Sequence, residues 1–344
     1  MTQPLALPSH EVRLDELGEL IAGLPGLLGF PPTDSLVLAT FTAGAGFQLG
    51  PTVRVDLPEP GDRLELVQQL CGALEQNQVA AAVAVVVGGG RGDPPALPHR
   101  GLARLFAQEV TDLGVRLVHS AWVPTIARDV TWWCYEDKEC TGQVRDPETS
   151  ALAVLQAVAG TVTYASRGEM ADVLAPDHED RVAHRAQLLA AQAELSPGDP
   201  ADLQRELLAL IESTTSRDSL PELDDVQIVR LSTALDHEQV RDICLSLSLT
   251  DRAGAAERLW TVLTRALPVP ERGEPAFLLA LCAYLRGAAI LAGMALEVSI
   301  DAVPDHSMAP LLRDALDKGT PPAHIRAMLT ESVHRAHRVQ RVRS

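Results

Sequence analysis

The chain has 344 residues, and 46% of them are hydrophobic, which is enough for two globular domains that each bury a core. Its 46 acidic side chains outnumber 29 basic ones, and the formal net charge is -17 at pH 7. A field of this sign repels phosphate polymers and anionic lipid headgroups, so neither nucleic acid nor a membrane surface is expected as a partner.

The cysteines and the N-terminal residues indicate a compartment. The first ten residues lack the basic stretch and apolar run of a secretory signal. Five scattered cysteines favour reduced thiols over a disulfide framework. One membrane-like stretch, residues 276–294, carries Arg286 near its centre, where a bilayer would impose about 2.5–3.5 kcal/mol. We therefore expect a cytoplasmic protein, with two buried helices in that stretch.

Strand and helix patterns alternate through the first part of the chain. A β-branched run between two helical patterns, followed by another strand, is typical of a crossover that joins parallel strands. The sequence predicts an α/β domain over residues 1–145 with a mixed, partly parallel sheet. The expected elements are a helix at 14–24 stopped by Pro25-Gly26, strands at 35–41 and 52–57 that could pair as a hairpin, a helix at 62–76, a strand at 79–87, a helix at 97–113 and a strand at 115–123.

From residue 149 onward the patterns are helical, and no segment convincingly predicts a strand. The sequence therefore predicts an all-α domain over residues 146–344. The expected helices are 150–159, 167–174, 178–194, 199–212, 222–235, 236–248, 251–267, 275–286, 288–302, 308–316 and 322–339.

One helical pair has the spacing of a tetratricopeptide unit. Gly287, Ala292, Leu296 and Pro304 fit the pattern, in which a glycine lets two helices turn and small residues let them pack closely. The segment 34 residues upstream is a poor copy. A tetratricopeptide-like hairpin and an ordinary helical hairpin both remain open.

Bulky aromatic residues gather at the end of the α/β domain. Trp122, Trp132 and Trp133 fall within twelve residues, and Tyr135 follows. Such side chains bury large areas, so we expect them to clamp the two domains together. The alternative is that they form the wall of a ligand pocket at the domain junction.

Cys134 and Cys140 have five residues between them, whereas paired zinc ligands are usually separated by two to four. His119 and His99 could join them only if the fold brought them near. No metal site and no cofactor are therefore expected.

Polar residues at predicted strand and loop ends are the remaining candidates for a site. The run Gly88-Gly89-Gly90-Arg91-Gly92 follows a strand, but its spacing matches no phosphate-binding fingerprint, so a flexible loop is expected there. Serines lack the context of a nucleophile elbow. Asp34, Asp56 and His99 lie at predicted loop or strand ends and could converge on one face of the sheet, although Asp34 also suits a simple turn. The candidate binding residues are Asp34, Asp56, His99, Arg100, Trp132, Trp133 and Tyr135.

The C-terminal tail is locally basic. Arginines from Arg326 to Arg343 alternate with apolar residues at helical spacing. This amphipathic pattern favours a last helix that docks on the acidic body, with nucleic-acid binding as the alternative.

Three segments together resemble a known family. They are 27–37 (Leu-Leu-Gly-Phe-Pro-Pro-Thr-Asp-Ser-Leu-Val), 53–57 (Val-Arg-Val-Asp-Leu) and 132–137 (Trp-Trp-Cys-Tyr-Glu-Asp). With Tyr164-Ala165-Ser166-Arg167 and Pro304-Asp305-His306, they resemble the actinobacterial domain-of-unknown-function family 4192 over nearly the whole chain. The chain departs from the family pattern at Cys140, where a Cys-Cys-Pro run is expected. The resemblance implies a cytoplasmic setting and no particular activity.

The leading functional hypothesis is a non-enzymatic binding or regulatory protein whose helical half contacts another protein or a second copy of itself. It depends on the missing catalytic motifs and on the stackable helices. The alternative is an enzyme or small-molecule sensor with its pocket at the domain junction.

Overall fold

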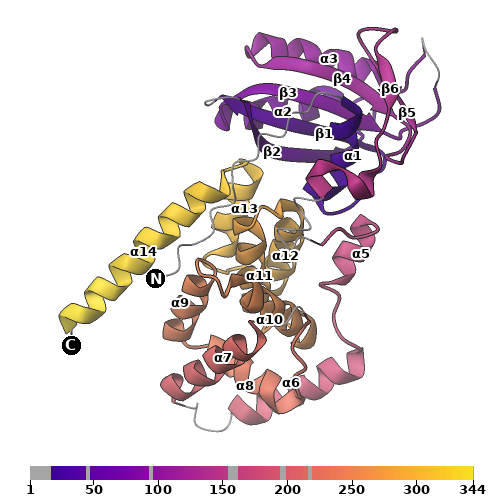
Figure 1. Cartoon of the computed structure of the whole chain (residues 1–344). Coiled ribbons are helices and arrows are strands. Elements are labelled where there is room, and N and C mark those ends of the chain that lie inside the picture. The colour runs from indigo at the N-terminus through magenta and orange to yellow at the C-terminus, as the bar shows by residue number, and fades with distance from the viewer. Residues whose placement is uncertain are drawn as a thin grey trace. The chain divides into compact units, whose positions relative to one another are not determined.

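The computed structural model describes residues 17–43, 47–92, 96–153, 162–193, 199–215 and 219–343 (Figure 1). The chain forms two compact units, Met1–Arg167 and Gly168–Ser344. The first unit contains a six-stranded sheet, and every strand of the described chain belongs to it. The second unit is helical in its described part.

The sheet has the order β2-β1-β3-β4-β5-β6. Strands β3 and β4 are parallel and all other neighbours are antiparallel, which confirms the predicted mixed, partly parallel sheet. The expected β1–β2 hairpin and the crossover from β3 through a helix to β4 are both present. The strands are β1 (Ser35–Ala43), β2 (Phe47–Asp56), β3 (Val79–Val87), β4 (Arg116–Val123), β5 (Thr131–Cys134) and β6 (Thr141–Gln143).

Two helices cover one face of the sheet. Side chains alternate between the two faces of a strand, so Leu36 of β1, Val86 of β3 and Trp122 of β4 project to the same side. There they form one apolar cluster with α2 (Arg63–Gln76) and α3 (Arg100–Asp112). The central strand β3 is apolar throughout because both of its faces are buried.

Two of the helix boundaries that differ from the sequence prediction are set by residues with positive φ. Helix α1 (Leu17–Leu28) continues through Pro25 and ends at Gly29, which has φ +84° and donates its N–H to the Pro25 carbonyl. The predicted stop at Pro25-Gly26 was therefore wrong, because a left-handed glycine closes the helix one turn later. Helix α3 begins at Arg100 rather than at residue 97, since His99 has φ +54°.

The second unit consists of helices that follow one another through short connections, as predicted. The expected helix over 150–159 falls largely on residues outside the described chain; a short 3-10 helix, η1 (Pro147–Thr149), precedes it. The helices are α5 (Arg167–Asp172), α6 (Glu179–Ala193), α7 (Pro200–Thr214), α8 (Asp225–Leu235), α9 (Glu238–Leu247), α10 (Ala253–Ala266), α11 (Gly273–Leu285), α12 (Ala289–Ala302), α13 (Ala309–Asp317) and α14 (Pro322–Arg343).

Helices α11 and α12 form the predicted hairpin. Gly287 turns the chain between them at φ +92°, and Arg286 pairs with Glu257 at 2.9 Å rather than entering an apolar layer. The likeness to a tetratricopeptide repeat stays a prediction. Among the described residues, no helix has the length and apolarity that a bilayer crossing requires.

The basic tail forms the last helix, α14. Arg326 donates a hydrogen bond of 3.2 Å to the carbonyl of Leu285, at the end of α11. The side chains from residue 333 onward, which include Arg335, Arg338 and Arg341, lie outside the described residues, and so does the predicted docking of those arginines.

Candidate functional site

Asp34 ties three strand ends together at the edge where β3 and β4 finish. Its carboxylate Oδ1 accepts a 2.7 Å hydrogen bond from the N–H of Gly89, just after β3. Its carbonyl accepts a 3.0 Å bond from the N–H of Leu57, just after β2. Asp34 itself has φ +44°, a conformation that Asp tolerates better than most residues. Asp34 is therefore a turn residue that joins the start of β1 to the ends of β2 and β3.

His99 meets the same glycine from the other side. Its Nε2 lies 3.0 Å from the Gly89 carbonyl oxygen. Gly89 has φ +72°, and a Cβ placed there would lie 2.4 Å from His99 Nε2, so only glycine suits this position. The structure therefore brings Asp34 and His99 together, joined by the backbone of Gly89.

Arg100 and Tyr135 also form hydrogen bonds at this edge of the sheet. The Arg100 guanidinium donates a 2.9 Å bond to the Tyr135 carbonyl, and the Tyr135 hydroxyl donates a 2.6 Å bond to the carbonyl of Pro98. Burial raises the pKa of Tyr135, and the charge of Arg100 opposes this only in part. The phenol therefore stays protonated and keeps its hydrogen bond to the Pro98 carbonyl, which holds the start of α3 against the end of β5.

Asp56 is the predicted candidate that stands apart from this set. Its carboxylate is 80% exposed and pairs with Arg54 at 2.5 Å. Arg54 also donates a 2.8 Å bond to the hydroxyl of Ser35. Asp34, His99, Arg100 and Tyr135 are thus linked by main-chain bonds that lock the edge, while Asp56 belongs to the surface of the β1–β2 pair.

The tryptophans divide between the two faces of the sheet. Trp122 and Trp133 stack with ring centroids 5.3 Å apart on the side of α2 and α3, and Trp122 donates a 2.8 Å bond to the Gly88 carbonyl. Trp132 projects to the opposite side, where Gly142 of β6 packs against its ring. These contacts all lie inside the first unit.

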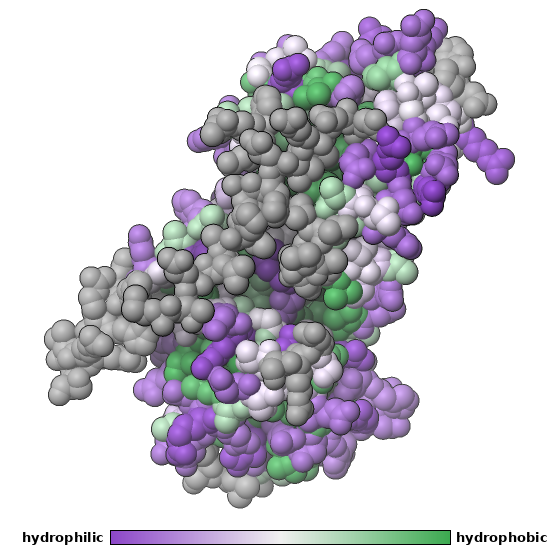
Figure 2. Space-filling model, viewed as in Figure 1, coloured by the Kyte–Doolittle hydropathy of each residue, from purple (hydrophilic) through white to green (hydrophobic). Residues whose placement is uncertain are grey.

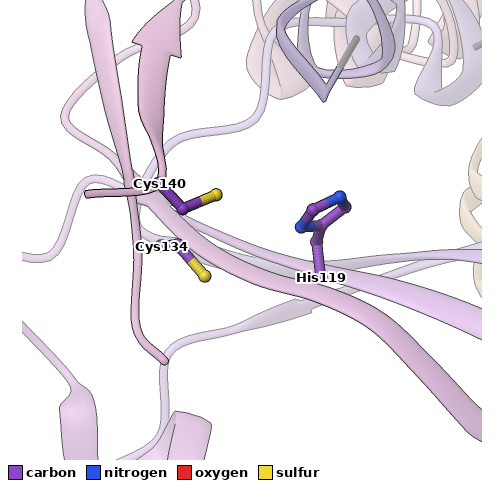
Figure 3. Close-up of side chains that lie close together, drawn as sticks. All are labelled: His119, Cys134 and Cys140. Carbon is purple, nitrogen blue, oxygen red and sulfur yellow. The ribbon is translucent and has the colours of Figure 1, made fainter. Parts of the chain in front are cut away.

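A separate cluster of metal-ligand side chains lies on the face that Trp132 shares. Ala121 of β4 pairs with Cys134 of β5, and the Cys134 N–H donates a 3.0 Å bond to the Cys140 carbonyl, so Cys134 and Cys140 are opposite each other. His119 lies two residues before Ala121 and projects to the same face. Figure 3 shows both sulfur atoms directed toward the side of the imidazole.

The three ligand atoms of this cluster, one nitrogen of His119 and the sulfurs of Cys134 and Cys140, all lie within 4.8 Å of one another. Cys134 is buried, while His119 and Cys140 are half-buried. Burial raises the pKa of the Cys140 thiol, and the neighbouring Cys134 raises it further. A cation that neutralised the thiolates would relieve this repulsion.

Of the two histidines that could have joined Cys134 and Cys140, the fold brings His119 beside them, whereas His99 contacts Gly89 instead. Thiolate and imidazole are ligands of zinc and other thiophilic metals, and the arrangement needs His119 as the third donor. The signal available in the sequence was weak. It consists of two cysteines that bracket a hairpin turn and one histidine on the neighbouring strand.

A family model described as "Domain of unknown function (DUF4192)" matches residues 18–323. No curated protein and no solved structure matches the chain significantly. The family match agrees with the resemblance carried by the segments around residues 27–37, 53–57 and 132–137.

Proposed function

Since the chain belongs to the DUF4192 family, whose description names no activity, we propose a function from its own side chains. The protein is a non-enzymatic regulatory protein that binds one zinc ion through His119, Cys134 and Cys140. The observation that carries this proposal is the distance between the three ligand atoms, which all lie within 4.8 Å of one another on one face of the sheet.

Zinc fits this donor set. It prefers thiolate and imidazole ligands in a tetrahedral arrangement, with Zn–S near 2.3 Å and Zn–N near 2.0–2.1 Å. Those bond lengths place ligand atoms about 3.5–3.8 Å apart, so the present cluster needs to contract by about 1.3 Å at most. Rotation of the His119 and Cys140 side chains supplies that movement, because both are half-buried rather than packed in the core.

The candidate binding residues at the carboxyl edge of the sheet have a structural role. They are engaged by the main chain: the Asp34 carboxylate by Gly89, His99 Nε2 by Gly89 and the Tyr135 hydroxyl by Pro98. These bonds stabilise the edge of the sheet.

The helical unit is the proposed surface for another protein. Green, hydrophobic residues reach the surface among its helices (Figure 2). Val226, Val269 and Leu311 are each more than 60% exposed. Pro176, Val182, Ala183 and Pro268 line an apolar depression of about 350 Å³ beside α6. These exposed apolar positions are the ones that we propose a partner contacts.

A zinc titration tests the metal site. The full chain, purified under reducing conditions and freed of metal with a chelator, is titrated with Zn²⁺ against a chromophoric competitor. We expect one Zn²⁺ per chain. Cys140→Ser and His119→Ala should each weaken binding more than about 100-fold, since loss of an outer-shell partner of a ligand alone costs about 10–100-fold.

Cys71→Ala is the matched control, because Cys71 is a buried thiol of the same unit that lies in the α2 packing layer. This variant should bind Zn²⁺ as the unchanged chain does. Circular dichroism confirms that each variant is folded. Equal affinity in the unchanged chain and in Cys140→Ser would overturn the proposal, and so would the absence of binding in the unchanged chain.

The protein contact is tested separately. Val269→Asp and Leu311→Asp place charges in exposed apolar positions without touching the core. Each should reduce recovery of a stoichiometric partner that the unchanged chain retains from native lysate. Retention of the same partner at the same level by both variants would contradict this part of the proposal.

A further inference from the structure

Cys134 and Cys140 occupy positions from which a disulfide can form. They face each other across the antiparallel β5–β6 pair and are joined by the 3.0 Å bond from the Cys134 N–H to the Cys140 carbonyl. Such hydrogen-bonded pairs have Cα atoms about 5.5 Å apart. A disulfide needs Cα atoms about 4.4–6.8 Å apart, so the backbone does not have to move.

We propose that Cys134 and Cys140 are a reversible oxidation site: a low-molecular-weight disulfide such as oxidised glutathione converts the two thiols to a Cys134–Cys140 disulfide, which removes both sulfur ligands of the zinc site. The metal-releasing part rests on the proposed function. Disulfide formation itself rests only on the strand pairing and on the free thiols.

The disulfide forms in two successive thiol–disulfide exchange steps. The Cys140 thiolate attacks one sulfur of the oxidant, forms a mixed disulfide and releases one reduced thiol. The Cys134 thiolate then attacks the Cys140 sulfur, closes the internal disulfide and releases the second thiol. The two cysteine protons end on the two released thiols, so the cysteine pair is oxidised by two electrons and the oxidant is reduced by two.

Exposure assigns the order of attack. Cys140 is half-buried and Cys134 is buried, so the external disulfide reaches Cys140 first. The remaining cysteines, Cys71, Cys244 and Cys282, are buried. An external disulfide reaches a buried thiol less readily than a half-buried one, so these three should react more slowly than Cys140.

The experiment uses the full metal-free chain, treated with oxidised glutathione and digested with trypsin without reduction. Trypsin cleaves after Arg128, Lys138 and Arg145, so Cys134 and Cys140 fall on different peptides, 129–138 and 139–145. We expect these two peptides to be linked, with a mass lower by two hydrogen atoms than their sum. We also expect the oxidised chain to lose Zn²⁺ binding and a reductant to restore it.

Controls separate the two proposals. Cys71→Ala should give the same linked peptides, and saturating Zn²⁺ should slow their formation. A link in a chain that never binds Zn²⁺ would remove the proposed function and leave the oxidation site standing. Zinc binding without the link, or glutathione retained on Cys140 as the end product, would overturn the inference.

Discussion

Arg185 on α6 is fully buried although its guanidinium is charged. It donates 2.7 Å to Asp225 and 2.8 Å to Asp177, and it also donates 3.0 Å to the Ala266 carbonyl. Two carboxylates on one arginine connect α6 to the start of α8 and to the chain before α6. Burying a charge costs free energy, so these ion pairs add little net stability while they are intact. Removing one carboxylate is strongly destabilising, because it leaves the buried guanidinium less compensated.

We therefore expect Asp225→Ala to lower the free energy of unfolding by about 3 kcal/mol, the low end for a broken buried pair, because Asp177 still faces the guanidinium. Arg230→Ala is the matched control: its pair with Glu206 is exposed, so the loss should stay below about 1 kcal/mol. Urea denaturation followed by circular dichroism measures both. Equal losses in the two variants would contradict this account.

The Arg185–Asp225 pair also makes the free energy of unfolding depend on pH. The hydrogen bond from Arg185 holds the pKa of Asp225 below its ordinary value, against the effect of burial. Its stabilisation is therefore complete above the unfolded-state pKa of about 3.9 and is lost as the pH falls through the lower folded-state value. The difference in stability between the unchanged chain and Asp225→Ala should be constant near neutral pH and shrink below about pH 4.

The side chain of His306 determines where α13 begins. His306 Nδ1 accepts bonds from the N–H groups of Met308 and Ala309 at 3.2 and 3.0 Å. Its Nε2 therefore carries the proton and lies 3.1 Å from the Glu274 carboxylate in the first turn of α11. The imidazole also packs on Phe277. His306 thus caps α13 and at the same time contacts the first turn of α11.

Replacing that histidine should loosen α13 locally. His306→Ala should lower the free energy of unfolding by about 1–2 kcal/mol, as loss of a helix cap does. Amide hydrogen exchange at Met308 and Ala309 should accelerate more than exchange in α8. Glu274→Gln keeps both cap bonds and should leave exchange at these two amides nearly unchanged. Uniform acceleration throughout the helical unit in His306→Ala would argue against a capping role.

The strands of the sheet differ in how well the sequence predicts them. Strands β1 to β4 were predictable because their apolar runs are long and their neighbours are fixed by a hairpin and by a crossover. Strands β5 and β6 were not predicted, since they have four and three residues and a tryptophan pair interrupts any alternation. The position of His119 beside Cys134 depends on the β4–β5 register. A pairing between strands that are not predicted cannot be inferred from spacing along the chain.

At the scale of the whole molecule, zinc should stabilise one unit and not the other. A ligand that binds only the folded state adds a free energy of RT ln(1 + [L]/Kd), which is about 2.7 kcal/mol at one hundred times Kd. The proposed ligands all belong to the first unit, which also contains Trp122, Trp132 and Trp133, whereas Trp260 belongs to the second. In a Trp260→Phe chain, tryptophan fluorescence therefore reports only on the first unit.

We expect Zn²⁺ to raise the thermal midpoint seen by fluorescence in Trp260→Phe. The increase should grow between pH 6 and pH 8, because the raised pKa of Cys140 makes metal binding release a proton from that thiol. The same chain with Cys140→Ser added should show no increase, while Cys71→Ala should preserve it. A zinc effect that is independent of pH, or that persists in the Cys140→Ser chain, would assign the stabilisation to ligands other than the thiol pair.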